Sequence, residues 1–212
     1  MWCGSDFTTD VDFGLGELLS GMVIIGGYGT VNSMQRVTAT NGVEEVVPRL
    51  LGEPLLPFGA LDYTRQFIDD DLRADSYRLE IGYGPFALEY RHTVYREDEP
   101  VAELDFKKVN ALLRMSFGDA VECDIGLGVL SMEGEKEYTG FSWSVPVVFH
   151  PTQYFGFEIR PSWAIIKDNT ISDFDAALVL GQRYLFLRAG YRWVKTGDVA
   201  LDGGYLGLSL RY

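Results

Sequence analysis

The sequence predicts an all-β protein: a closed, antiparallel, up-and-down transmembrane β-barrel of about ten strands. Three observations support this fold class. From Tyr77 onward, hydrophobic and polar residues alternate with a period of two almost without interruption. The alternating segments are about 9 to 13 residues long, which a tilted strand needs to cross a bilayer, whereas soluble strands average about 5 or 6. Short turns and longer polar connections also alternate along the chain, as they do in outer-membrane barrels.

Length and composition are consistent with a single barrel domain over residues 1–212. The chain is 47% hydrophobic and 14% aromatic, and its mean hydropathy is zero. It contains no run of about 20 apolar residues, so a helical membrane protein is excluded. The net charge of −13 excludes nucleic acid as a partner.

Each alternating segment has one hydrophobic face and one face of charged or small residues. In the segment 86–95, Phe86 and Leu88 point to one side, and Glu89 and Arg91 point to the other. Such strands separate an apolar environment from a polar one. The predicted strands are 77–83, 86–95, 104–117, 121–132, 138–149, 154–166, 173–182, 184–195 and 203–212.

An even number of strands requires one more, upstream of Tyr77. The best candidate is Gly21–Val31, which is rich in β-branched residues. Residues 32–76 then form a long external loop, in which Val43–Leu51 and Pro57–Ile68 are apolar enough for a short helix, an extra hairpin or a plug. The alternative is an eight-stranded barrel with a separate N-terminal third.

The connections and the aromatic residues follow the two sides of the predicted barrel. Tight turns fall at 84–85, 118–119, 150–153 and 182–183, and longer polar connections fall near 96–103, 133–137, 167–172 and 196–202. Two aromatic girdles are expected at the two membrane interfaces. The girdle residues are Phe86, Phe117, Phe149 and Phe155 on one side, and Trp143, Trp163 and Trp193 on the other.

The last predicted strand carries a C-terminal pattern of a polar residue, a glycine, and hydrophobic residues ending in an aromatic one. Tyr205, Gly207, Leu210 and Tyr212 fill these places. The pattern resembles the C-terminal assembly signal of bacterial outer-membrane barrels, which offers a strand edge to the insertion machinery. With this motif, residues 77–212 resemble the small opacity, OmpA-like and OmpW-like barrels in style. The resemblance implies a bacterial outer-membrane location and contact with the barrel-assembly machinery.

The polar face of the strands carries nearly balanced charges. Because a buried charge must be paired, this balance predicts an ionic network inside a narrow or closed lumen. The predicted lumen residues are Arg78, Glu80, Glu89, Arg91, Lys108, Arg114, Glu122, Asp124, Glu158, Arg160, Asp173, Asp175, Arg188, Arg192 and Arg211.

Catalytic and cofactor motifs are not found in the sequence. His92 falls on the apolar face of its strand and His150 in a predicted turn, and no Ser–His pair, metal-ligand cluster, phosphate loop or CxxC motif accompanies them. Cys3 and Cys123 form no disulfide framework. We therefore expect no enzyme activity, no metal and no cofactor.

Three functions remain open. The first is a structural or surface-interaction barrel, whose partners are outer-membrane lipids, lipopolysaccharide and a surface partner that contacts the loops. The second is a narrow channel or transporter for small solutes, and the third is a soluble, lipocalin-like ligand-binding barrel. No Lys or Arg precedes the apolar stretch that begins at Leu18, so the export signal of an outer-membrane protein is absent from this chain.

Overall fold

The computed structural model describes residues 58–211, apart from residues 70–71, 98–101, 118–119, 135, 153, 168, 183 and 198. In this part of the chain every regular element is a strand, and no helix is long and apolar enough to cross a membrane. The strands are β1 (Phe58–Phe67), β2 (Leu72–Tyr83), β3 (Phe86–Glu97), β4 (Ala102–Phe117), β5 (Val121–Glu133), β6 (Glu137–Ser144), β7 (Val147–Phe149), β8 (Phe155–Ile166), β9 (Asn169–Gln182), β10 (Leu185–Thr196) and β11 (Val199–Arg211).

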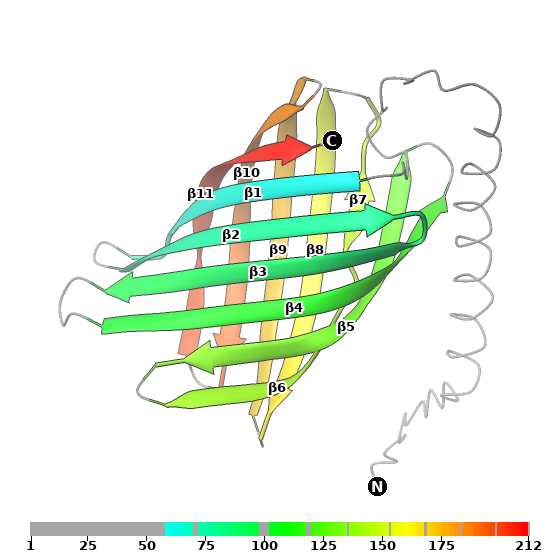
Figure 1. Ribbon diagram of the computed structural model, residues 1–212. Helices are drawn as coiled ribbons and strands as arrows, with labels where there is room; N and C mark the ends of the chain where they lie inside the picture. Colours follow the sequence, from blue (N-terminus) through cyan, green and yellow to red (C-terminus); the bar gives the residue numbers. More distant parts are fainter. Residues whose placement is uncertain are drawn as a thin grey trace, which may run out of the picture.

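The strands form one closed antiparallel sheet. Each strand pairs with its neighbours in sequence, and β1 closes the barrel by pairing with β11 from Ala60↔Arg211 to Phe67↔Gly204. Figure 1 shows this closure, with β1 in cyan lying beside β11 in red. The predicted antiparallel barrel is therefore confirmed.

The segments β6 and β7 are two parts of one barrel strand, because both pair with β5 and with β8. Pro146 separates them, since proline has no backbone N–H to donate to a ladder. Two backbone hydrogen bonds hold the interruption in place: Asp124 donates to the Pro146 carbonyl at 2.8 Å, and Val145 donates to the Pro161 carbonyl at 3.0 Å. Counted in this way, the barrel has ten strands, as predicted, and not eight.

The predicted position of the tenth strand, residues 21–31, was wrong. That strand is β1, at residues 58–67, and β2 already begins at Leu72, so these residues of the predicted 32–76 loop belong to the barrel wall. The candidate strand at 21–31 and residues 32–57 of the loop, which include the segment 43–51, lie outside the described residues, as do residues 70–71. A period of two is hard to see in β1 because its outward positions mix Leu61 and Phe67 with Arg65.

The connections at one end of the barrel are shorter than predicted. This end, here called the loop end, joins strands through residues 68–71, 98–101, 134–136, 167–168 and 197–198. Lys167 and Gly197 have positive φ angles of 55° and 57°, which suit the tight turns of two-residue hairpins. The opposite end, here called the base, holds the turns 84–85, 118–120, 150–154 and 183–184, the start of β1 and the end of β11.

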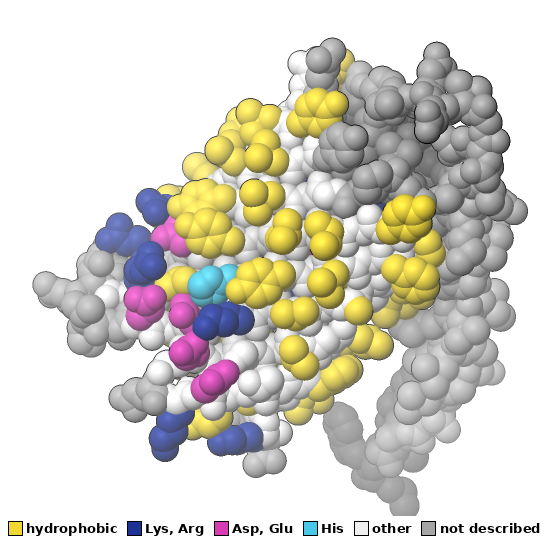
Figure 2. All heavy atoms as spheres, in the orientation of Figure 1, with side chains coloured by type: hydrophobic (Ala, Val, Ile, Leu, Met, Phe, Trp, Pro, Cys, Tyr) yellow, Lys and Arg dark blue, Asp and Glu magenta, His cyan; other side chains and the backbone are white. Residues whose placement is uncertain are grey.

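The outer wall of the barrel is largely apolar. Each of the described strands carries at least one exposed large hydrophobic side chain. Figure 2 shows hydrophobic side chains spread over much of the described surface in view, with charged side chains gathered at the loop end. Examples of exposed positions are Leu61, Ile81, Leu88, Leu127, Ile165, Leu187 and Leu206. Such a continuous apolar surface is unusual for a soluble monomer.

Candidate functional site in the barrel interior

The predicted lumen residues all lie on the inward-facing rows of the wall. Asp173 is partly exposed and the others are buried. Asp62 on β1, which the sequence analysis placed in a loop, joins them at 2% exposure. With Asp62 included and Glu97 at the loop-end rim left aside, the inward basic and acidic residues are equal in number among the described residues. The basic set is Arg78, Arg91, Lys108, Arg114, Arg160, Arg188, Arg192 and Arg211, and the acidic set is Asp62, Glu80, Glu89, Glu122, Asp124, Glu158, Asp173 and Asp175.

Neighbouring strands of one wall carry like charges at facing positions. Arg78 faces Arg91, and Arg91 faces Lys108, across β2, β3 and β4. Glu80 likewise faces Glu89. Like charges at directly opposite positions repel each other, so the wall needs compensating charges from elsewhere.

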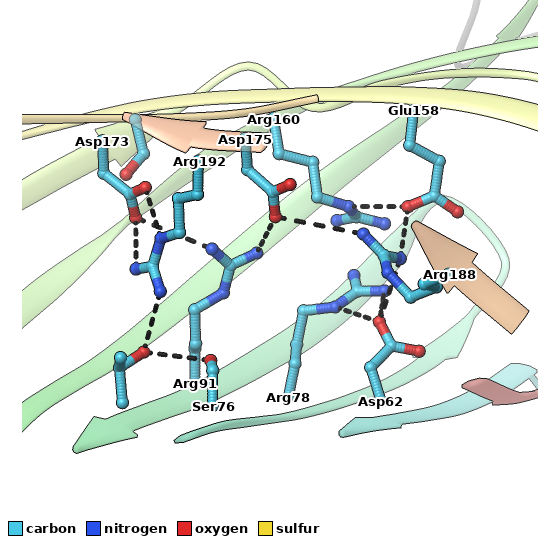
Figure 3. A network of polar contacts seen from close by, with 12 residues as sticks. Asp62, Ser76, Arg78, Arg91, Glu158, Arg160, Asp173, Asp175, Arg188 and Arg192 are labelled. Atoms are coloured by element: carbon cyan, nitrogen blue, oxygen red, sulfur yellow. Dashed lines mark hydrogen bonds and ion pairs between the residues drawn. The ribbon is translucent and has the colours of Figure 1, made fainter. Parts of the chain in front are cut away.

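The compensating charges come largely from the opposite wall. Arg91 on β3 lies 3.6 Å from carboxylate oxygens of both Asp173 and Asp175 on β9. Arg160 on β8 lies 3.6 Å from Glu80 and 3.4 Å from Glu89. These pairs cross the lumen, as Figure 3 shows for Arg91 and Asp175. They therefore tie the two walls together as well as balancing the charge.

Asp62 and Glu158 form the centre of the network near the base. Arg188 on β10 bridges them, at 3.2 Å from an Asp62 oxygen and 2.7 Å from a Glu158 oxygen. Arg78 donates to Asp62 from Nε at 2.7 Å, and Arg211 also pairs with Glu158. Figure 3 shows Asp62, Arg78, Arg188 and Glu158 converging from different strands. Because these groups are almost fully buried, each depends on its partners to offset desolvation.

A second group surrounds Arg192 at mid-height in the barrel. Its guanidinium binds Asp173 through two hydrogen bonds of 2.8 and 2.9 Å and donates to Thr93 Oγ1 at 3.1 Å. Arg192 thereby links β10, β9 and β3. Tyr205 donates from its hydroxyl to Asp175, and the ring lies against Gly190, where an added Cβ would meet the ring at 2.6 Å. Sequence reasoning gave Tyr205 only the polar place in the C-terminal pattern.

The interior changes character at the loop end. There an apolar cluster fills the lumen, and Tyr95 and Phe106 pack edge to face with ring centroids 5.4 Å apart. The buried members, contributed by eight of the strands, are Ala74, Tyr95, Phe106, Leu130, Ala164, Ile166, Ile171, Val194 and Leu201. Sequence reasoning missed this cluster, although its members occupy inward positions of the alternating pattern.

Little empty space remains in the described interior. One cavity of about 20 Å³ lies between the apolar cluster and the charges and is lined by Tyr95, Phe106, Lys108 and Arg192 among others. A second, also of about 20 Å³, lies among Asp62, Arg78, Arg188 and Tyr205. A cavity that holds one water molecule needs roughly 10–15 Å³, so each has room for about one or two.

His150 helps to fill the base of the barrel. Its side chain is buried, and its Nε2 lies 3.3 Å from Arg211 Nη1. The ring fits over Gly156, where an added Cβ would lie 2.0 Å from the His150 Nδ1. His92 lies on the outer face instead, with its Nε2 3.5 Å from Asp105 Oδ1. The two histidines therefore lie on opposite faces of the barrel wall. In the contacts described, neither lies beside a nucleophilic side chain.

The predicted girdle residues lie on the outer face. Phe86, Phe149, Phe155, Trp143 and Trp193 are exposed there, and Phe117 and Trp163 are partly exposed. Trp143 and Trp163 stack across β6 and β8 with centroids 4.1 Å apart. Of the C-terminal pattern, Tyr205 and Gly207 face inward and Leu210 faces outward, while Tyr212 lies outside the described residues.

The described residues therefore form a closed ten-stranded barrel with a largely apolar outer wall, in which buried ion pairs lie toward the base and an apolar cluster lies at the loop end. No family model matches the chain, and no curated protein matches it. Among solved structures, the chain is similar to the KdgM porin in complex with disordered oligogalacturonate, with 6% sequence identity and a TM-score of 0.39. The similarity covers 73% of this chain and 99% of that one.

Proposed function

We propose that this chain is an integral barrel of a bacterial outer membrane with a closed interior and a structural or surface-interaction role. The apolar outer wall supports the membrane location, because water is a poor solvent for it and acyl chains are a good one. We place the loop end at the cell surface and the base in the periplasm. In this orientation the tryptophans near the loop end and the phenylalanines near the base occupy the two interfaces.

The observation that carries the closed interior is the set of ion pairs across the lumen. Arg91 with Asp173 and Asp175, and Arg160 with Glu80 and Glu89, occupy the path that a solute would take. Breaking such a pair leaves buried charges without partners, which costs about 3–5 kcal/mol. The apolar cluster at the loop end adds a second barrier, since ions do not enter a dry apolar constriction readily.

The test is a conductance measurement on the full chain, folded in detergent and inserted into planar bilayers. We expect a heat-modifiable band on a gel, outer-membrane fractionation and no stable conductance at physiological ionic strength. A large, steady, non-selective conductance would contradict the closed interior. A chain that stays soluble and monodisperse without detergent would contradict the membrane location and favour the lipocalin-like alternative.

A narrow channel is the second candidate, and one observation favours it. Arg91 and Arg192 line both interior cavities, so a rotation of these two side chains would join the cavities into a longer polar path. In this case we expect small, anion-selective current steps, because the side chains that line the path are cationic. Arg192→Gln would then change the ion selectivity, whereas in a closed barrel it would only lower stability.

The partners follow from the proposed location. They are the outer-membrane lipids, lipopolysaccharide and, during biogenesis, the barrel-assembly machinery. The last strand supports a contact with the assembly machinery, because Leu206, Leu208 and Leu210 give β11 an apolar outer row. In the interior, most of the described carboxylates are engaged by arginines, as Asp62, Glu158 and Asp173 are.

A further inference from the structure

The outer face of the barrel carries two charged regions of opposite character at the loop end. Outward positions of β1 to β3 in this region hold Arg65, Arg73 and Arg96 against Asp75. Corresponding positions of β4 to β6 hold one lysine among four acids: Lys107 with Glu103, Asp105, Glu133 and Glu137. Three guanidiniums thus gather on one side of a chain whose net charge is −13.

Two of the three arginines, Arg65 and Arg96, are held in place by Asp75. Arg65 donates from Nε at 2.8 Å and from Nη2 at 3.4 Å, and Arg96 donates from Nη1 at 3.4 Å. The Tyr63 hydroxyl adds a hydrogen bond of 2.8 Å, so Asp75 is covered although it lies on the outer face. The Arg65 and Arg96 side chains nevertheless remain 48% and 52% exposed. A guanidinium has five N–H donors, more than a shared carboxylate can accept.

The strand register places Arg73 beside Arg96, at directly facing positions of β2 and β3. The cationic side chains of β2 and β3 are thus adjacent, and Asp75 pairs with Arg96 at 3.4 Å. Glu103, which faces Arg96 from β4, is 3.9 Å from its Nε and lies on the far side from Arg73.

The position of the three arginines relative to the membrane suggests what the anion is. Tyr63 and Tyr77, which pack with ring centroids 5.1 Å apart, lie next along the strands toward the base, and Leu61, Leu79 and Ile81 follow. Tyrosines mark the interface of a membrane-spanning barrel, so the arginines lie at the level of the lipid headgroups. An arginine fork matches the geometry of a phosphate group.

We propose that Arg65, Arg73 and Arg96 form a binding site for the phosphate groups of an outer-leaflet glycolipid of the lipid A type. The proposal rests on the proposed membrane location and orientation, and it deepens the lipid partnership by naming the site. Asp75 acts as a positioning residue that keeps the Arg65 and Arg96 forks directed outward. The acidic side of the same belt, on β4 to β6, repels such phosphates and limits the site to β1–β3.

The experiment uses the full chain in detergent micelles with lipid A as the ligand and native mass spectrometry as the readout. Lipid A with two phosphates is compared with its monophosphorylated form and with inorganic pyrophosphate. We expect the double variant Arg65→Gln/Arg96→Gln to bind bisphosphorylated lipid A at least tenfold more weakly. The matched control, Lys107→Gln/Lys195→Gln, removes the same charge from other exposed positions and should bind within twofold of the parent chain.

Three outcomes would overturn the proposal: unchanged binding in the arginine variant, an equal loss in the lysine control, or pyrophosphate binding as tightly as lipid A. The last would identify a site for free phosphate instead of lipid. The variant Arg65→Lys/Arg96→Lys retains the charge without the guanidinium fork, and we expect an intermediate loss of lipid A binding. This variant replaces the glutamine variant as the test if the glutamine variant does not fold. Heat-modifiability and fractionation are measured on the same samples. A barrel that is folded and located in the outer membrane but does not bind lipid A refutes the lipid A site and leaves the proposed location intact.

Discussion

At the base, the barrel interior is held together by charges, and at the loop end by apolar side chains. The base uses long arginine and glutamate side chains that reach across the lumen, such as Arg188 between Asp62 and Glu158. The loop end uses compact contacts between rings and aliphatic groups around Phe106. The charged region depends on complete pairing, whereas the apolar region depends on filled volume. The two regions should therefore respond differently to substitution.

The largest effect is expected in the charged region. Glu158→Gln removes one charge and leaves Arg188, Arg211 and Arg160 without a shared partner. We expect the free energy of unfolding to fall by about 3–5 kcal/mol, the cost of breaking a buried pair. The measurement is urea-induced unfolding in micelles, followed by the gel shift between folded and unfolded forms.

A compensating change separates pairing from simple loss of packing. Adding Arg188→Met to Glu158→Gln removes an uncompensated charge and should recover part of the lost stability. Glu137→Gln, at an exposed position on β6, is the matched control and should leave unfolding unchanged. If the double variant is less stable than Glu158→Gln by the full cost of Arg188→Met alone, the pairing account is wrong.

The second effect tests the apolar region. Phe106→Ala empties the space beside Tyr95, and a buried phenylalanine lost to alanine typically costs about 3 kcal/mol or somewhat more. The loss should be partly restored by a volume-conserving change such as Phe106→Leu. Urea unfolding is again the measurement, and an alanine variant as stable as the parent would show that the apolar cluster contributes little.

The difference between the regions also explains which parts were predictable. A period of two is a local property, so the inward orientation of Glu158, Arg188 and Arg192 could be predicted from the sequence. Asp62 was missed because β1 is defined by its pairing with β11, a contact between the two ends of the described chain. The apolar cluster was missed because alternation assigns Phe106 to the inner row but does not say that its neighbours there are also apolar.

Packing at the base gives the third prediction. Gly156→Ala places a Cβ 2.0 Å from the His150 ring, so the ring must move or the strands must separate. Overpacking of this kind costs about 1–3 kcal/mol. Combining Gly156→Ala with His150→Ala removes the ring that the new Cβ would meet. The loss of unfolding free energy in the double variant should therefore be smaller than the sum of the two single losses and close to that of His150→Ala alone. Strict additivity in this double-mutant cycle would contradict a direct clash.

The smallest effect is expected for an ion pair of the same chemistry outside the barrel. Lys107 donates to Glu133 at 2.6 Å across β4 and β5, a shorter contact than many inside, yet both side chains are about half exposed. Water and salt screen such a pair, and ordering two long side chains offsets the attraction. Lys107→Ala should therefore leave the urea midpoint unchanged within error at high and low salt. A loss comparable to that of Glu158→Gln would mean that distance, and not burial, sets the strength of these pairs, and the contrast between the interior and the outer wall would have to be abandoned.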